Sequence, residues 1–265
     1  MPAAVSTRTP APGRRRFSPR LWVPNQHGAW AMLLLPLVVG AARAGLRWTH
    51  LWLLVAWLLA YLAYFAAGVW LRSRRKPRYR TPVVVYGALA AAVGGGLLLA
   101  EPGLARWGLV YAPLAAASLA HSARRTERAL TNDVLTVAAT SLMAVVAHGL
   151  AVPGTAWLPG AASAEAWAVA AATGAYLVGT ALYVKTMIRE RGNRGMYVAS
   201  VAYHVVVAAA LAWWLPWVGA FLALTAVRAA VVPRRWPHAR PVAVGVGEIA
   251  ASALLAVVLL ALPLG

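Results

Sequence analysis

The residues best suited to chemistry are polar side chains that lie near one end of several long apolar runs. We predict a general acid or base at His27 or His204, with Asp133 orienting it or receiving a proton. These three residues belong to different runs, so they can act together only if folding gathers those ends at one place. The side chains expected to line the resulting polar cavity and bind its substrate are Gln26, Asn132, Tyr183, Lys185 and Arg189.

Two basic segments predict that the ligand of this cavity is an anion. Residues 71–82 read LRSRRKPRYRTP, and residues 183–194 read YVKTMIRERGNR. Lys76, Arg78 and Arg80 of the first segment could hold phosphate or pyrophosphate, since arginine forks and lysine ammonium groups bind both. The lysine and arginine of the second segment would complete the site. The alternative is that these charges only set the membrane orientation and attract anionic lipid.

Structural roles are an open alternative for the deeper polar residues. A single buried His or Glu is equally consistent with a structural hydrogen bond or an ion pair, such as one between Glu248 and Arg228. A stripe of residues at spacings of 3 and 4 shares one face of the helix expected over 164–186. Its hydroxyl groups could line the cavity or form hydrogen bonds between helices. The stripe consists of Thr173, Tyr176, Thr180, Tyr183 and Met187.

Metal chemistry receives little support from the sequence. Mg²⁺ prefers oxygen ligands, yet the chain has only six acidic residues and no DxxD-type cluster, so Mg²⁺ is weakly supported and no cofactor is predicted. Cysteine is absent, which excludes thiolate metal sites and cysteine nucleophiles. No HExxH motif or Ser-His-Asp arrangement is apparent, and we predict no metal site. Four of the six histidines are spread over four expected helices, so a histidine metal site is conceivable only if the bundle gathers them. They are His27, His121, His148 and His204.

The composition identifies a membrane protein. Of 265 residues, 62% are hydrophobic and 12% are charged, whereas soluble domains have about 45–50% apolar and about 25% charged residues. The formal charge of +19 would suggest a nucleic-acid partner in a soluble chain. Here the basic residues lie mostly in short segments between apolar runs, so we expect the lipid bilayer as partner and no nucleic acid.

The hydropathy pattern predicts an all-α, polytopic transmembrane bundle of about nine helices, since one span needs about 20 mostly apolar residues. The first helix is expected to begin near Val23 and to include residues 25–27. We interpret Gly94 to Gly96 as a site of close helix packing and expect a very tight turn near 213–216. The expected spans are 23–42, 50–71, 82–100, 104–121, 130–152, 164–186, 196–213, 215–232 and 241–263.

The distribution of basic residues predicts the orientation of these spans. Arg- and Lys-rich segments precede the first span and then follow every second one, which places the N-terminus in the cytoplasm and the C-terminus outside. We expect a multi-pass protein of the cell inner (plasma) membrane. Residues 1–20 are predicted to be a disordered basic cytoplasmic tail, and residues 21–265 a single transmembrane domain.

Four sequence motifs stand out: NQHGAWAM at 25–32 followed by Pro36, KPRYRTP at 76–82, Glu127 with the pair Asn132 and Asp133, and YVKTMIRE at 183–190. Together they resemble the YwiC-like family of bacterial membrane proteins. The QHGAW and YVKTMIRE elements are the more specific ones. The resemblance implies a multi-pass membrane protein and specifies no reaction.

The expected architecture also looks like that of the UbiA-type prenyltransferases, which have nine helices and polar cytoplasmic loops after helices two and six. Those loops carry Asp-rich motifs for Mg-pyrophosphate in that superfamily, whereas here they read RSRRKPRYR and KTMIRERGN. The likeness therefore implies a membrane transferase without the usual motifs, or a binder of a phosphorylated or prenyl lipid. The alternatives are a transporter for a small anionic metabolite and a non-catalytic membrane assembly protein.

Overall fold

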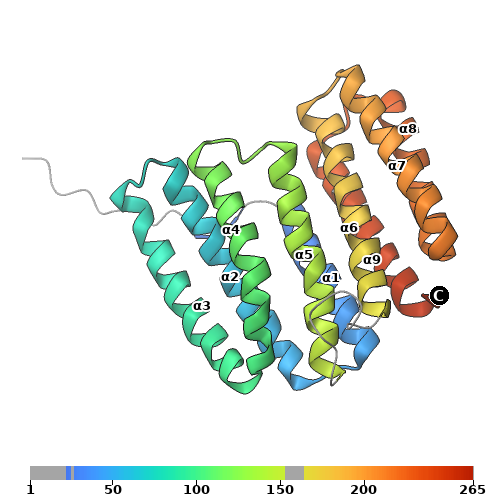
Figure 1. Ribbon diagram of the computed structural model, residues 1–265. Coiled ribbons are helices and arrows are strands. Elements are labelled where there is room, and N and C mark those ends of the chain that lie inside the picture. Colours follow the sequence, from blue (N-terminus) through green and yellow to red (C-terminus); the bar gives the residue numbers. More distant parts are fainter. Residues whose placement is uncertain (1–21, 25–26, 153–163, 265) are drawn as a thin grey trace, which may run out of the picture.

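The computed structural model describes residues 22–24, 27–152 and 164–264, and the tail predicted at 1–20 lies outside that part. The predicted all-α bundle is confirmed, because each of the nine expected spans is a helix within the described residues (Figure 1). The helices are α1 (His27–Ala44), α2 (Trp48–Arg72), α3 (Arg80–Ala100), α4 (Gly108–Ala123), α5 (Leu130–Ala151), α6 (Ala164–Val184), α7 (Arg194–Trp214), α8 (Pro216–Arg235) and α9 (Pro241–Ala261).

Seven of these helices are long and apolar enough to cross a bilayer, namely α2, α3 and α5 to α9. The other two helices of the described part, α1 and α4, are shorter, with 18 and 16 residues. Helices satisfy their backbone hydrogen bonds internally, which a chain must do where lipid offers no partners. The protein is therefore a multi-pass integral membrane protein.

The start of α1 corrects the expectation that the first helix begins near Val23. Val23 lies in a bend, Pro24 has no regular structure, and the helix begins at His27. A proline ring clashes with the backbone of the preceding residue and disfavours the α conformation there. The chain therefore leaves the proline before it turns into a helix. Asn25 and Gln26 lie outside the described residues.

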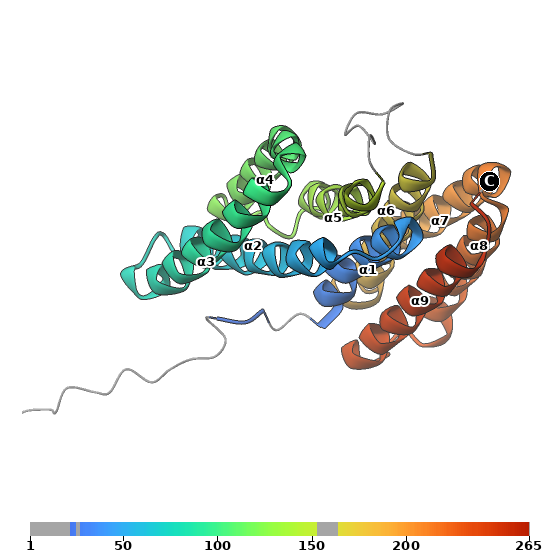
Figure 2. The same ribbon diagram turned by 90° about the horizontal axis from the view of Figure 1, so that it is seen from below.

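The centre of the bundle is formed by α1, α5 and α6, and α9 packs on α1 and α6 (Figure 2). Val39 and Ala144 are completely buried there. A Cβ atom on Gly40 would lie 2.3 Å from the carbonyl oxygen of Ala144, so the two backbones touch. Lipid tails are as apolar as leucine, and helix association in a membrane depends on such close packing between small residues.

A single residue, Leu215, joins α7 to α8, which confirms the predicted tight turn. Pro216 is the first residue of α8, where the missing N–H of proline is not needed. A Cβ atom on Gly219 would lie 2.3 Å from the Cα atom of Ala212. The glycine thus lets the two helices approach closely one turn after the connection.

The helices α2, α3 and α4 form a second group that contacts the centre chiefly through α4 and α5 (Figures 1 and 2). A Cβ atom on Gly96 would lie 2.9 Å from the ring of Trp52, which confirms close packing of α3 on α2 at that glycine. Gly94 and Gly95 have no such neighbour. A cleft lies between this group and the centre.

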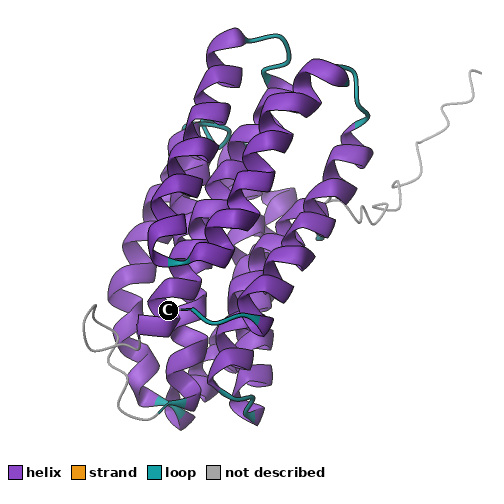
Figure 3. Cartoon of the chain, turned by 90° about the vertical axis from the view of Figure 1, so that its right-hand side faces the viewer, coloured by secondary structure: helices purple, strands orange, loops and turns teal. Residues whose placement is uncertain are grey.

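The connections α2–α3, α4–α5, α6–α7 and α8–α9 all lie at one end of the molecule (Figure 1). We call this the basic end, after residues 72–80, 124–128, 189–194 and 234–240. All described elements are helices joined by loops and turns, and no strand occurs among the described residues (Figure 3). The basic end is therefore built from helix termini and short connections.

Candidate functional site

A large cleft lies between the α2–α4 group on one side and α6 with α9 on the other. Its volume is about 1480 Å³, and α5 runs along it. Most lining residues are apolar and come from the membrane-spanning parts of the helices. Charged and amide side chains gather where the cleft reaches the basic end. They are Arg72, Glu127, Arg128, Asn132, Asp133, Lys185 and Arg189.

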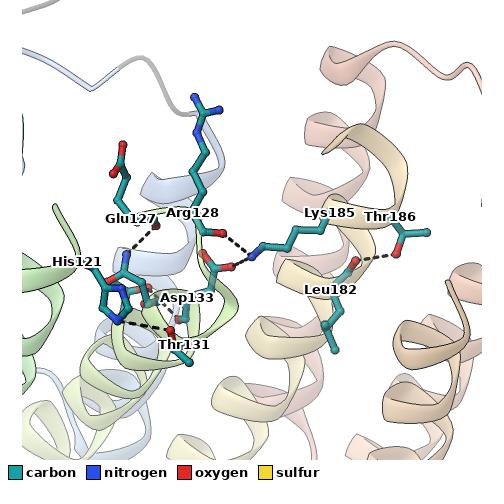
Figure 4. A network of polar contacts seen from close by, with 10 residues as sticks. His121, Glu127, Arg128, Thr131, Asp133, Leu182, Lys185 and Thr186 are labelled. Atoms are coloured by element: carbon teal, nitrogen blue, oxygen red, sulfur yellow. Dashed lines mark hydrogen bonds and ion pairs between the residues drawn. The ribbon is translucent and has the colours of Figure 1, made fainter. Parts of the chain in front are cut away.

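Lys185 and Asp133 form an ion pair at this charged end of the cleft (Figure 4). The Lys185 ammonium lies 2.5 Å from a carboxylate oxygen of Asp133 and donates a hydrogen bond of 2.8 Å to the Arg128 carbonyl. Lys185 is only 8% exposed. A buried ammonium is stable only with a partner, and here its partners come from α5 and the segment before it.

Local structure places both members of the pair. Lys185 opens a π-helical turn, Lys185–Arg189, that continues α6. Such turns are rare and occur frequently at functional sites, and this one brings Arg189 to the cleft together with Lys185. Asp133 lies in the first turn of α5, where the helix dipole favours a carboxylate.

Asn132, the residue before Asp133, is held by neighbouring helices. Its Oδ1 accepts a hydrogen bond of 2.5 Å from Ser118, and its Nδ2 donates one of 2.9 Å to the Glu127 carbonyl. The Ser118 hydroxyl also lies 2.6 Å from the Tyr64 hydroxyl. This chain of contacts links α2, α4 and α5 and fixes the first turn of α5 beside the cleft.

Two arginines at the charged end have no carboxylate partner in the described part of the chain. Arg72 lies 3.6 Å from Glu127, and Lys185 is paired with Asp133, whereas no ion pair involves Arg128 or Arg189. Both of these arginines are exposed and line the cleft. Figure 4 shows the Arg128 guanidinium extended away from the ion pair. These two side chains are free to bind an anion.

A second polar group lies deeper along the cleft. Glu248 forms an ion pair with Arg228 at 2.7 Å and accepts a hydrogen bond of 2.8 Å from Thr180, which confirms the pairing considered from the sequence. The Tyr176 hydroxyl lies 3.1 Å from Ser252 and also contacts Glu248. Interhelical hydrogen bonding is therefore confirmed for two members of the stripe on α6. The group joins α6, α8 and α9.

His204 is not among the described residues that line the cleft. Its Nδ1 donates a hydrogen bond of 2.7 Å to the Ser200 carbonyl, and its ring packs against Gly179 of α6. The expectation that His204 shares a cavity with Asp133 is therefore wrong for this cleft. The physical reason is that α7 packs chiefly on α8 and also on α6, so His204 is buried against α6 and away from the cleft.

Tyr183 is also placed away from the cleft. The guanidinium carbon of Arg228 lies 4.4 Å from the centre of its ring, a cation–π contact. Tyr183 packs in a small buried cluster with Met187, Ala229 and Val244. Tyr183 contacts Arg228, the arginine that pairs with Glu248. It does not line the cleft, so the expectation that it lines the cavity is wrong for this cleft.

The predicted anion-binding residues of the α2–α3 connection lie apart from Lys185. Lys76 and Arg78 line a separate hollow, and the exposed Arg80 at the start of α3 lines neither space. Sequence reasoning instead missed Arg72 and Arg128, which do reach the cleft. Arg72 ends α2 and Arg128 lies two residues before α5, and these positions gave only a weak signal because either side chain could equally have faced water.

Two predicted residues are not tested by the structure. Gln26 lies outside the described residues, and the side chain of His27 is not described either, so their roles stay predictions. Within the described ranges, no three His, Asp or Glu side chains are placed to hold a metal ion. The site as described consists of basic, amide and carboxylate groups at the end of an apolar cleft.

Comparisons with known proteins identify the family. The profile of the YwiC-like protein family matches residues 23–148. The Bacillus subtilis (strain 168) protein called uncharacterized protein YwiC is 31% identical over 185 residues, which cover 69% of this chain and 74% of that protein. An uncharacterized protein of Haemophilus influenzae is 30% identical over 197 residues, covering 71% and 76%. No solved structure matches. The chain belongs to the YwiC-like family.

Proposed function

We propose that this membrane protein binds a phosphorylated amphiphile in the cleft, with the headgroup at the charged end and the apolar chain between α2–α4 and α9. The observation that carries the proposal is the continuity of one cleft of about 1480 Å³ from an apolar interior to a cluster of basic side chains. A ligand with one charged and one apolar end matches both parts, because arginine and lysine bind phosphate and apolar walls bind hydrocarbon.

The charge at the headgroup end fits a phosphate. Four basic residues and two carboxylates line it, and the pairs Arg72–Glu127 and Lys185–Asp133 are neutral. Four minus two leaves a formal charge of +2, carried by Arg128 and Arg189. A phosphate monoester carries about −1.5 to −2 charges near pH 7, so it would neutralise this end. Lys185 can supply a further hydrogen bond from its third N–H.

The cytoplasm is the compartment to which this end opens in our proposal. The gathering of the basic connections at one end supports an N-terminus in the cytoplasm and a C-terminus outside, since basic loops stay on the cytoplasmic side. The membrane is the inner (plasma) membrane in this proposal. Fusion of alkaline phosphatase after Gly192 should give no activity, and fusion after Leu262 should give activity. The reverse pattern would contradict the orientation.

The ligand test uses thermal unfolding of the full chain in detergent. We expect stabilisation by a prenyl diphosphate, such as geranylgeranyl diphosphate, that approaches about 2.7 kcal/mol at 100 times its dissociation constant. Inorganic pyrophosphate should stabilise less because it does not fill the apolar part. Each compound is measured with and without Mg²⁺. If no phosphorylated amphiphile stabilises the protein, the proposal fails.

Arg189→Gln tests the site directly. It should weaken the stabilisation by the prenyl diphosphate, whereas Arg194→Gln, at the exposed first residue of α7, should not. Both variants remove one positive charge from the basic end, so the comparison separates a local contact from a general electrostatic effect. Equal losses in the two variants would mean that the cleft is not the binding site.

Chemistry on the bound lipid is a further part of the proposal. The likeness to UbiA-type prenyltransferases suggests transfer of a prenyl group from its diphosphate to a nucleophilic atom of an acceptor lipid. The bond between the prenyl carbon and the diphosphate oxygen would break, and Arg128, Lys185 and Arg189 would stabilise the departing pyrophosphate in place of metal-binding carboxylates. Asp133 would receive the proton of the acceptor. A radiolabelled prenyl diphosphate incubated with the protein and membrane lipids should then yield a labelled lipid product. Stabilisation without a product would assign the protein to lipid binding alone.

Transport is the second candidate, favoured by the buried pair of Glu248 and Arg228 beside the cleft. Ionisable residues at membrane depth commonly mark ion or substrate pathways, and the exposed edge of Glu248 lines the cleft. Proteoliposomes loaded with a labelled anionic metabolite would test this function. Release that depends on the protein and is lost in Glu248→Gln would favour transport over lipid binding.

A further inference from the structure

A small hollow lies between the connections that follow α2 and α4 at the basic end. Its volume is about 380 Å³. Four cationic side chains, one hydroxyl and one phenol line it, and no carboxylate belongs to its described lining. None of these residues lines the large cleft. The lining residues are Ser73, Arg74, Lys76, Arg78, Tyr79 and Arg125.

Two of the arginines occupy a backbone conformation that favours glycine. Arg74 has φ of 59° and Arg125 has φ of 60°, and each is the second residue after the end of a helix. Glycine is the usual residue at such positions, because a side chain is strained in the left-handed region. A basic residue near a helix C-terminus is favoured by the helix dipole. The helix dipole explains a basic residue at the end of each helix. It does not explain why arginines from the ends of two different helices line the same hollow.

Neighbouring groups orient the side chains of the hollow. Arg125 donates a hydrogen bond of 3.2 Å from Nε to the Arg72 carbonyl, which ties the α4–α5 connection to the end of α2. Arg78 lies over the Tyr79 ring at 4.7 Å and donates a hydrogen bond of 2.7 Å to its hydroxyl. Lys76 has no ion-pair partner among the described residues. Neighbouring groups therefore hold two of the four cations, and no carboxylate of the described lining compensates the positive charge.

We infer that this hollow is a second anion site, distinct from the cleft, that binds the phosphate of an anionic lipid headgroup or of a soluble phosphate compound. Arginine forks recognise phosphate oxygens through paired hydrogen bonds, and lysine adds a point charge. A basic pocket at the cytoplasmic surface of a helical membrane protein is also where anionic lipid headgroups accumulate. The inference does not depend on the proposed occupant of the cleft.

The test is binding of short-chain phosphatidylglycerol to the detergent-purified full chain, counted as bound lipids by native mass spectrometry. Arg78→Gln/Arg125→Gln should weaken binding by at least about fivefold for each arginine removed. The matched control is Arg235→Gln/Arg240→Gln, which removes two exposed arginines from the same end but outside the hollow. Phosphatidylcholine is the neutral-lipid control. If Arg78→Gln/Arg125→Gln does not fold, Arg78→Lys/Arg125→Lys takes its place, because lysine keeps the positive charge but lacks the arginine fork.

The outcomes separate the sources of the phosphate. If inorganic phosphate displaces phosphatidylglycerol from the site around Arg78 and Arg125, the site also binds soluble phosphates. If it does not displace the lipid, the site binds lipid headgroups. Equal weakening in the two double variants, or equal binding of phosphatidylcholine, would overturn the inference. Arg189→Gln distinguishes this site from the cleft, because it should leave unchanged the part of phosphatidylglycerol binding that is lost in Arg78→Gln/Arg125→Gln, whether or not the cleft binds an amphiphile.

Discussion

Lys185, in the π-helical turn that continues α6, lies 2.5 Å from Asp133 of α5, and both side chains line the charged end of the cleft. The ammonium also donates to the carbonyl of Arg128, so the peptide chain before α5 is held by the same contact. An anionic headgroup that enters here meets a lysine already engaged by a carboxylate. Asp133 therefore acts as an internal competitor of the proposed ligand.

This competition predicts opposite effects for two substitutions in one ion pair. Lys185→Met should weaken binding of a prenyl diphosphate at least about tenfold, because a charge-assisted hydrogen bond contributes about 1.5–3 kcal/mol. Asp133→Asn should preserve or tighten binding, because it removes the competing charge and leaves the Lys185 contact to Arg128. Titration followed by thermal unfolding measures both. Equal weakening in the two variants would show that the pair is only structural.

The pair of Glu248 and Arg228 should behave as a coupled unit. Glu248→Gln and Arg228→Met each leave a buried group without its partner and should lower the free energy of unfolding. The double variant should cost less than the sum, with a coupling energy of about 0.5–3 kcal/mol. Unfolding of the four proteins in mixed detergent gives the cycle. Additive losses would mean that the two charges do not interact significantly.

Gly40 and Gly87 offer a matched test of the packing in the centre of the bundle. A Cβ atom on Gly40 would collide with the Ala144 backbone, whereas one on Gly87 would have nothing within 4 Å. Gly40→Ala should therefore destabilise the protein by at least about 1–3 kcal/mol, the usual cost of overpacking. Gly87→Ala should be neutral or slightly stabilising, since alanine favours helix. Similar results for both would contradict the observed α1–α5 contact.

His204 should influence stability without influencing the ligand of the cleft. His204→Gln removes a ring that packs on Gly179, so a lower unfolding temperature is expected. Binding of the prenyl diphosphate should keep its affinity, since the histidine does not line the cleft. The affinity of His204→Gln for the prenyl diphosphate is measured at a temperature where this variant is folded. Loss of binding in the folded variant would restore His204 to the site.

The helices of this protein follow largely from local sequence. The lengths of the helices and the order of the basic connections depend on the lengths of the apolar runs. The turn at Leu215 depends on local residues such as Pro216, whose effect extends over only a few positions. The exception is the start of α1, where Pro24 delays the helix to His27. Sequence also predicted that Asp133, Lys185 and Arg189 share one polar cavity, because polar groups near apolar runs are costly and therefore conspicuous, and all three line the cleft. Their roles in binding and catalysis stay predictions.

Tertiary structure alone decided which of those groups meet. Helical periodicity shows that residues share a face, but it does not show which helix that face contacts, so His204 and Tyr183 were assigned to the wrong space. In lipid, apolar residues cover both the outer and the inner faces of helices, and hydropathy cannot separate them. The ion pair of Lys185 with Asp133 arises only from the packing of α5 on α6. The entry of Arg72 and Arg128 into the cleft and the separate hollow around Arg78 arise only from the packing of α2, α3 and α4 with one another and on the centre.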